Sequence, residues 1–409
     1  MSTKEVNNKR LFLAACVSLI VTAMTFGVRA GILGQLGVDF ALTDTQLGFV
    51  NSMAFLGFPI ATVIGGLVYN SVGPKKLMAV AFICHILGLV MTIMATGYWT
   101  LLISTFFIGF ANGSVEAACN PMIADMYTKK RTAMLNKFHM WFPGGIVVGA
   151  LASKFMTDAG MGWQIQISIM LIPTILYGIL FFGQIFPKSE NIVSDTKENI
   201  KNVFTPLFLF IFVCMSLTAI SEFGPQQWVE RILSSTGASP MLVLAMITGL
   251  MAIGRYFGGA VLKKINPPAI LLISAVVATI AIYLMSSATG GMVYVAAVLF
   301  AIGVMYFWPT MIGFVAEYIP KSGALGMSLV GGVGMLSTAI WQPVIGNWLD
   351  GARETAIASG ISEESADLVA GQSTLGNMVW FPVILIVLFG ILFFMRNKVE
   401  EGRVAQEGH

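Results

Sequence analysis

The sequence predicts an all-α membrane protein that crosses the bilayer as twelve helices. Of its 409 residues, 56% are hydrophobic and only 11% are charged, whereas a soluble domain carries about 25% charged residues. The hydrophobic residues are gathered in runs of about 20 residues or more, the length that a helix needs to span a bilayer. The net charge of +3 and the lack of a basic face with interleaved aromatic residues argue against nucleic-acid binding.

Twelve apolar runs are long enough to be transmembrane spans. The predicted spans lie near residues 11–38, 44–72, 76–97, 99–127, 132–157, 163–186, 204–232, 239–264, 268–288, 291–319, 322–349 and 374–395. The first run is too long for the core of a signal peptide, so we interpret it as a retained span. A polar segment divides the chain into an N-terminal six-helix bundle (1–187), a cytoplasmic linker (188–203) and a C-terminal six-helix bundle (204–409). A second polar and acidic segment, 350–373, is predicted to be a loop.

The charges of the loops predict the orientation. Every turn on one side of the predicted spans carries at least one Lys or Arg, and the opposite loops carry mainly acidic residues such as Asp39, Asp44 and Asp158. Positively charged loops stay on the cytoplasmic side of a membrane. Both termini are therefore predicted to be cytoplasmic, in the inner (plasma) membrane of the cell.

Motifs for metal, disulfide or nucleotide chemistry do not occur in the sequence. The four cysteines lie within apolar runs and lack CxxC spacing, which argues against a disulfide framework and a metal site. Neither a GxxxxGK[ST] phosphate loop nor an HExxH or GxSxG motif occurs. We therefore expect no cofactor, no metal, no catalytic residue and no ATP-driven process.

The stretch from Asn112 to Gly149 carries polar side chains inside predicted spans. Asn112, Glu116 and Asn120 are spaced at i, i+4 and i+8 and form one stripe on a helix. Asn136 and His139 follow one turn apart at the start of the next span. A carboxylate and an imidazole at membrane depth are costly and rarely persist without a partner or a water-filled cavity. We expect Glu116 and His139 to approach the same basic turn from opposite sides.

Two halves of the chain echo each other, because the fourth span contains Asn120-Pro121 and the tenth contains Trp308-Pro309. Over nearly its whole length the chain resembles the major facilitator superfamily. Within it, Glu116-Ala-Ala-Cys-Asn120-Pro121 followed by Leu135-Asn136-Lys-Phe-His139 resembles the fucose–proton symporter group of sugar transporters. The resemblance implies two pseudo-symmetric six-helix bundles with a substrate site at the membrane midplane between them, and Glu116 as the carboxylate that is protonated during transport.

The chain departs from the pattern of this family at two places. The fucose–proton symporter group has an acidic residue on the first span, where this chain has Gly27-Val-Arg29-Ala. The superfamily motif GxxxDRxGRR appears here as the segment from Gly66 to Lys75, without its Asp and its first Arg. The gating ion pair that the motif normally forms therefore lacks these two residues.

Three further charged residues are candidates for gates. Arg29 shares one face of the first span with Ser18, Thr22 and Thr25, and at about 1.5 Å per residue it lies about 27 Å from the start of its span, as Glu222 does in the seventh. We expect Arg29 and Glu222 to face one another as an extracellular gate. Alternatively, each reaches the outer interface, or Arg29 acts as a fork for a substrate carboxylate.

Arg255, near the cytoplasmic end of the eighth span, is the third candidate. It is expected to pair with Asp125 or Glu317 as an inner gate or as a structural latch.

A sugar site combines amide or carboxylate groups for the hydroxyls with aromatic faces for the apolar C–H side of the ring. Candidate residues of these types lie within the predicted spans. They are Gln226, Gln227, Trp228, Tyr306, Trp308, Trp341, Gln342, Asn377 and Trp380, with Asn51, Asn112, Asn120 and Asn136 from the N-terminal half. For each Trp the alternative is a place in the interfacial aromatic belt. His139 is either a proton carrier with Glu116 or a structural hydrogen-bond partner.

Taken together, these patterns predict a monomeric secondary transporter that moves a monosaccharide by alternating access with a proton. Sodium is an alternative ion, because a carboxylate and amides also bind hard cations. A second hypothesis is a symporter for a hexuronate or similar anion, with Arg29 binding its carboxylate. Drug efflux is less favoured because the predicted cavity is rich in amides. A hypothesis from another class is a membrane solute sensor that does not transport.

Overall fold

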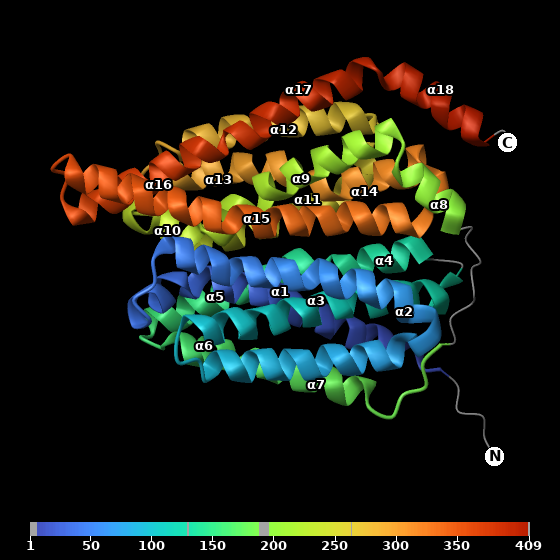
Figure 1. Ribbon diagram of the computed structural model, residues 1–409, viewed down its shortest axis with the longest axis horizontal. Coiled ribbons are helices and arrows are strands. Elements are labelled where there is room, and N and C mark those ends of the chain that lie inside the picture. The colour runs from blue at the N-terminus through green and yellow to red at the C-terminus, as the bar shows by residue number, and fades with distance from the viewer. Residues whose placement is uncertain (1–5, 129–130, 188–195, 263, 408–409) are drawn as a thin grey trace. The chain divides into compact units, whose positions relative to one another are not determined.

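The computed structural model describes residues 6–128, 131–187, 196–262 and 264–407, and these residues form helices joined by short turns (Figure 1). The predicted all-α fold class is confirmed. Two parts of the sequence interpretation lie outside the described residues. They are Lys129 and Lys130 of the basic turn, and residues 188–195 of the predicted linker.

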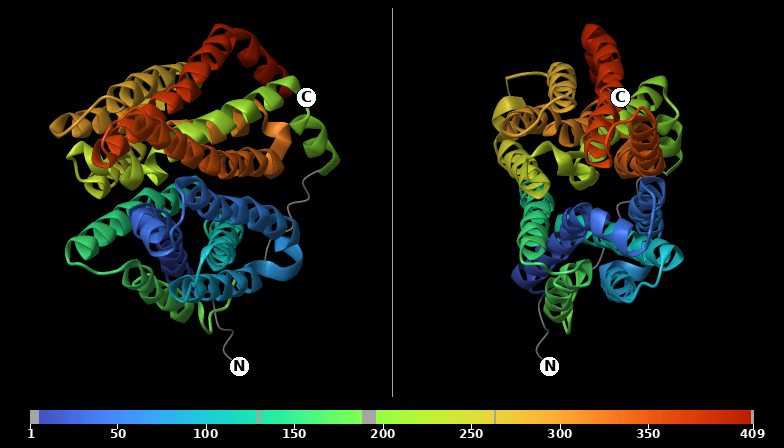
Figure 2. Two further views of the ribbon diagram at one scale, coloured as in Figure 1. Left: turned by 60° about the vertical axis from the view of Figure 1, so that its left-hand side comes forward. Right: turned by 90° about the vertical axis from the view of Figure 1, so that its left-hand side faces the viewer.

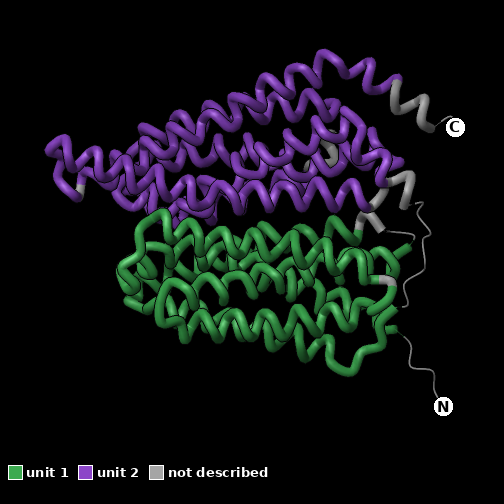
Figure 3. Tube along the Cα trace, viewed as in Figure 1, with its two compact units in different colours: residues 1–192 green, residues 193–409 purple. Residues whose placement is uncertain are grey.

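The chain divides into two compact units, residues 1–192 and 193–409 (Figure 3). The division falls within the segment predicted as a linker. Unit 1 contains α1 (Asn8–Asp39), α2 (Asp44–Ile93), α3 (Tyr98–Met126), α4 (Arg131–His139), α5 (Trp141–Asp158), α6 (Trp163–Ser168) and α7 (Leu171–Phe181). Its long helices run alongside one another in a bundle, as the views in Figures 1 and 2 agree.

Unit 2 is also a bundle of helices. It contains α8 (Thr196–Val203), α9 (Pro206–Gln227), α10 (Val229–Leu233), the 3-10 turn η2 (Ser234–Thr236), α11 (Pro240–Leu262), α12 (Pro267–Met285), α13 (Gly291–Val304), α14 (Phe307–Tyr318), the 3-10 turn η3 (Pro320–Ser322), α15 (Gly323–Ala358), α16 (Glu363–Met378), α17 (Trp380–Phe394) and α18 (Arg396–Glu407).

Among the described residues, 11 helices are long and apolar enough to cross a membrane, and they overlap eleven of the predicted spans. The predicted fifth span, near 132–157, is not one of them. There the chain forms α4 and α5, which are separated at Met140, and α5 ends on the charged Lys154 and Asp158. Crossing of the membrane by this segment stays a prediction.

The prediction of a loop over residues 350–373 is wrong. α15 continues to Ala358 and α16 begins at Glu363, so a short turn joins two helices. The charged residues of this region pair with one another, because Arg353 Nε donates to Asp367 Oδ1 at 2.6 Å and Arg353 Nη1 lies 3.9 Å from Asp350 Oδ1. Polar composition did not end the helices, since paired charges are compatible with a helix that extends beyond the apolar layer.

In unit 1, α2 packs directly against the backbone of α3. A Cβ atom on Gly109 would lie 2.2 Å from the carbonyl oxygen of Ala54, and one on Gly113 would lie 2.1 Å from that of Phe58. Only glycine permits so close an approach of two membrane helices. This contact positions the part of α3 that carries Glu116, one turn beyond Gly113.

Candidate functional site

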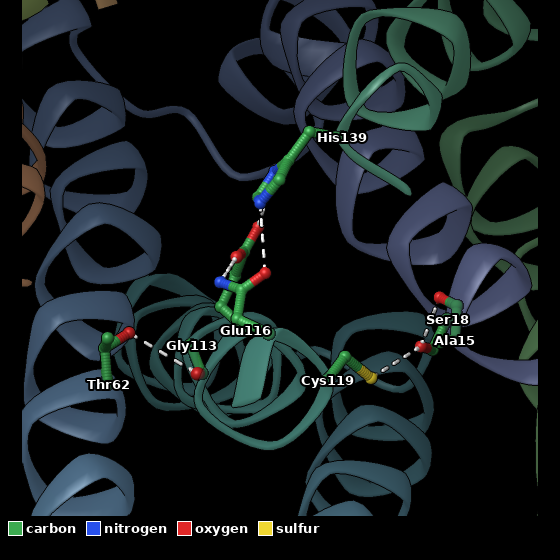
Figure 4. Close-up of polar contacts among 8 residues, drawn as sticks. Ala15, Ser18, Thr62, Gly113, Glu116, Cys119 and His139 are labelled. Atoms are coloured by element: carbon green, nitrogen blue, oxygen red, sulfur yellow. Dashed lines mark hydrogen bonds and ion pairs between the residues drawn. The ribbon is translucent and has the colours of Figure 1, made fainter. Parts of the chain in front are cut away.

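Three polar side chains of unit 1 meet where α3 approaches α4. Asn120 Nδ2 donates to Glu116 Oε2 at 2.6 Å, and His139 Nε2 lies 3.0 Å from Asn120 Oδ1. His139 Nδ1 lies 3.9 Å from Glu116 Oε1, and the two side chains point toward one another (Figure 4). Glu116 is 11% exposed and His139 47%. The structure thus brings together three residues that the sequence singled out.

The hydrogen bonds define where protons sit in this cluster. Because an amide oxygen only accepts, His139 Nε2 carries the proton that is donated to Asn120 Oδ1. In the neutral ring, His139 Nδ1 presents a lone pair to the Glu116 carboxyl group. In the charged ring it presents a second N–H. An additional proton therefore has two neighbouring acceptors, the imidazole and the carboxylate. Such an arrangement is suited to pass a proton between the imidazole and the carboxylate.

The Asn112 side chain is not part of the Glu116–Asn120–His139 cluster. Its side chain joins a buried hydrogen-bonded chain with Tyr177, His85 and Thr25, which we call the Tyr177–Thr25 chain. His85 Nδ1 lies 2.9 Å from Tyr177 Oη, His85 Nε2 lies 2.9 Å from Asn112 Oδ1, and Asn112 Nδ2 donates to Thr25 Oγ1 at 3.0 Å. Thr25 donates to the carbonyl oxygen of Thr22 at 2.6 Å. The chain links α1, α2, α3 and α7.

The direction of donation in the Tyr177–Thr25 chain follows from the same logic. The amide oxygen of Asn112 fixes the proton of His85 on Nε2, so His85 Nδ1 accepts from the Tyr177 hydroxyl. Sequence reasoning missed His85 and Tyr177. A histidine alone in the apolar third span was a usable signal, but its partner lies far away in the chain. Binding of substrate by Asn112 stays a prediction, and in this structure its amide serves helix packing.

Arg29 and Asn51 are both buried in unit 1. The Arg29 guanidinium carbon lies 5.1 Å from the centre of the Phe26 ring and 5.3 Å from that of Phe55, so two aromatic faces stabilise its charge. Neither amide atom of Asn51 has a hydrogen-bond partner among the described residues. A buried amide without partners is costly, which makes Asn51 a strong candidate for contact with water or a solute.

In unit 2, Arg255 pairs with Glu222, and no pairing with the expected Glu317 is found among the described residues. The alternative pairing with Asp125 would join the two units and stays a prediction. Arg255 Nη2 donates to Glu222 Oε1 at 2.9 Å. The sequence interpretation placed Glu222 near the outer end of its span. In the structure Glu222 lies on α9 within reach of the long side chain of Arg255 on α11. The predicted contact of Arg29 with Glu222 would join the two units and stays a prediction.

Two aromatic candidates lie beside this ion pair. Arg255 Nε donates to the carbonyl oxygen of Met305 at 2.9 Å, and the hydroxyl of the next residue, Tyr306, donates to the carbonyl oxygen of Gly254 at 3.1 Å. The Trp308 ring packs edge-on against Phe223, 6.0 Å between centres. Tyr306 and Trp308 therefore contact the residues next in sequence to Arg255 and Glu222, which are Gly254 and Phe223.

The remaining candidates of unit 2 divide into buried and exposed residues. Gln226, Gln227, Trp228 and Gln342 are buried. Gln226 Nε2 lies 3.6 Å from Met251 Sδ, whereas Trp228 Nε1 and both amide atoms of Gln342 have no hydrogen-bond partner among the described residues.

Asn377 and Trp380 are exposed and lie in a mainly aromatic cleft of about 320 Å³ with Trp341, Trp348 and Phe381. In unit 1, Asn136 is exposed on α4. Substrate contact by each of these residues stays a prediction.

The described residues contain no group of three or more His, Cys, Asp or Glu side chains placed to hold a metal ion.

The sequence matches the family model described as Major Facilitator Superfamily over residues 11–342. The chain belongs to the Major Facilitator Superfamily. It is accordingly a multi-pass membrane protein with the major facilitator fold.

Other superfamily members resemble this chain at low identity. It is 22% identical to myo-inositol transporter 1 of Candida albicans over 44% of this chain and 34% of that protein. It is 23% identical to the hexuronate transporter of Bacillus subtilis over 55% of this chain and 58% of that protein. A solved bacterial homologue of the human lysosomal transporter Spinster, inward-facing and unoccupied, superposes with a TM-score of 0.77 at 16% identity over 96% of this chain and 98% of that one. That likeness shows the fold.

Proposed function

We propose that this superfamily member is a secondary active transporter that moves a monosaccharide or a close derivative by alternating access, together with a proton. The proposal rests on the Glu116–Asn120–His139 cluster. A carboxylate at 11% exposure, held by an amide and facing an imidazole at 3.9 Å, is an arrangement suited to reversible protonation. Protonation removes a charge from the cluster and thereby changes which state of the transporter is stable.

Amide-rich candidates favour a polar solute over a hydrophobic drug. Asn51 and Gln342 are buried with both amide atoms unpartnered among the described residues, and hydroxyl groups of a sugar would satisfy such donors and acceptors. One relative is named as a transporter of myo-inositol, and myo-inositol is a polyhydroxylated ring. Sodium in place of the proton stays an alternative for the ion, and the monomeric state stays a prediction.

A hexuronate or related anion is the second candidate substrate. The likeness to a hexuronate transporter favours it. In the form predicted from the sequence, Arg29 would bind the carboxylate.

The test is uptake by purified protein in liposomes, with and without an inward proton gradient. Wild type is expected to concentrate a labelled sugar only with the gradient, and Glu116→Gln is expected to lose concentration while it still exchanges sugar across the membrane. Glu354→Gln, an exposed carboxylate on α15, is the matched control and should behave as wild type.

Unchanged gradient dependence in Glu116→Gln would refute the coupling assignment. Tight binding without flux in wild type would instead favour a sensor that does not transport.

A further inference from the structure

The two partners of the Glu222–Arg255 ion pair differ in their access to solvent. The Glu222 side chain is 4% exposed, whereas that of Arg255 is 23% exposed. The guanidinium is held through Nη2 by Glu222 and through Nε by the Met305 carbonyl. Its third nitrogen, Nη1, makes no hydrogen bond to the described part of the chain. A partly exposed planar fork with one nitrogen not bonded to the described residues is suited to bind a carboxylate.

The surroundings of Arg255 fit a ring that has both hydroxyl groups and apolar faces. The half-buried Tyr306 donates to the carbonyl oxygen of Gly254, next in sequence to Arg255, and the half-buried Trp308 packs against Phe223, next in sequence to Glu222. A Cβ on Gly334 of α15 would lie 2.9 Å from the Trp308 ring.

Glu222 is left incompletely satisfied. Its second oxygen, Oε2, is buried and has no hydrogen-bond partner among the described residues. A buried carboxylate that loses the cation paired with it is strongly disfavoured in the charged form. If a solute anion took Arg255 over, Glu222 would therefore bind a proton.

From these contacts we propose that Arg255 is the binding group for the carboxylate of an acidic monosaccharide, and that Glu222 occupies this place when the site is empty. The inference rests on the proposed transport function and specifies its substrate class. One anion and one proton enter together: the anion pairs with Arg255, and the proton neutralises Glu222. The site has the same net charge when it is empty and when it is loaded, so either form can change conformation without moving an uncompensated charge.

Arg255 on α11 is the described charged group that acts on the Glu222 carboxylate. Other titratable side chains lie on or before elements that pack against α9. They include Lys201 on α8, Glu230 and Arg231 on α10, Tyr294 on α13, Tyr306 before α14, Glu317 and Tyr318 on α14, and Asp367 on α16. α17 and the part of α15 from 323 to 349 carry no titratable side chain, and residues 193–408 contain no histidine. The proton taken up on anion binding is assigned to Glu222, the carboxylate that pairs with Arg255, and the Glu222→Gln variant tests this assignment.

Arg255 is also better placed than Arg29 to receive an anion. Arg29 is buried and lies over two phenylalanine rings. The Arg255 guanidinium is more exposed, and one carboxylate already pairs with it.

D-glucuronate and D-glucose form the matched pair of probes, because they differ only in a carboxylate at C6. Binding is measured by calorimetry on the purified full-length protein and uptake in liposomes, for wild type, Arg255→Lys, Arg29→Gln and the double variant Glu222→Gln with Arg255→Gln. The double variant is used because Arg255→Gln alone would leave a buried carboxylate without its cation and could prevent folding.

We expect wild type to bind glucuronate at least about ten-fold more tightly than glucose, and the double variant to lose at least about thirty-fold of the glucuronate affinity. Arg255→Lys should lose part of it, because the charge remains and the fork does not. Proton uptake on glucuronate binding, measured in weak buffer, should fall by about one proton in Glu222→Gln and stay unchanged in Glu354→Gln.

Equal glucuronate affinity in wild type and the double variant would overturn the proposal, as would loss of binding in Arg29→Gln alone or full proton uptake in Glu222→Gln. If glucose is concentrated and glucuronate is neither bound nor moved, the transport function stands and this inference falls. If neither compound binds or moves in wild type, both fall.

Discussion

Removal of the Tyr177 hydroxyl should destabilise unit 1, because it leaves a buried acceptor without a donor. In Tyr177→Phe the ring keeps its contacts with Phe82 and Phe181, 5.7 and 6.3 Å between centres. Nδ1 of His85, which is fully buried, loses the hydrogen bond of 2.9 Å. An unsatisfied buried polar group costs about 1–3 kcal/mol.

For a domain of about 200 residues that cost corresponds to a fall in melting temperature of about 2–12 °C. Thermal unfolding of the purified protein in detergent measures it. Tyr283→Phe is the control, because Tyr283 is a phenol exposed on α12, and its removal should change stability by less than about 0.5 kcal/mol. Equal melting temperatures for the two variants would show that the Tyr177–Thr25 chain does not stabilise the bundle as described.

Two further predictions concern packing and surface charge. Gly113→Ala should destabilise the protein by about 1–3 kcal/mol, because its methyl group would overlap the backbone of α2, whereas Gly66→Ala, with nothing within 4 Å, should stabilise it by up to about 1 kcal/mol; thermal unfolding that gives both variants the same sign would contradict this. Arg353→Gln should cost at most about 1 kcal/mol and leave uptake unchanged, since Arg353 and Asp367 are 25% and 40% exposed; a large loss of uptake would contradict it.

Hydropathy was sufficient to place most of the helices, because a bilayer requires long apolar runs whatever their packing partners. It was not sufficient where polar residues continue a helix. Residues 350–373 are polar, yet all but the turn between α15 and α16 are helical, and Arg353 pairs with acids on both sides of that turn. Composition indicates whether a segment lies in lipid or in water. It does not show which charged side chains pair with one another, because the pairing depends on the folded structure.

The Glu116 cluster could be anticipated because its members are close in sequence. Asn120 follows Glu116 by one turn, and His139 lies just across the turn between two helices. Asn112 was placed on the same stripe, but at 100° per residue a separation of eight positions rotates it by about 80° from Asn120. That rotation is enough for Asn112 to contact His85 while Glu116 and Asn120 contact His139.

The partners of His85 and Arg255 could not be anticipated in the same way. Tyr177 lies 92 residues from His85, and Glu222 lies 33 residues from Arg255. Each of these contacts depends on how whole helices pack, and a list of polar residues leaves several partners equally plausible. Depth counted along an ideal helix did not predict Glu222 as a partner of Arg255, because it does not show which faces of α9 and α11 meet.

The backbone contact of α2 with α3 limits which parts of unit 1 can move. At Gly109 and Gly113 no layer of side chains separates α2 from α3. We therefore expect the two helices to move as one rigid body. Glu116 and Asn120 belong to this rigid body because they lie on α3, whereas His139 lies on α4. The distance between spin labels on α2 and α3 should thus stay constant when the conformation changes. The distance from a label on α4 to either of them is expected to change.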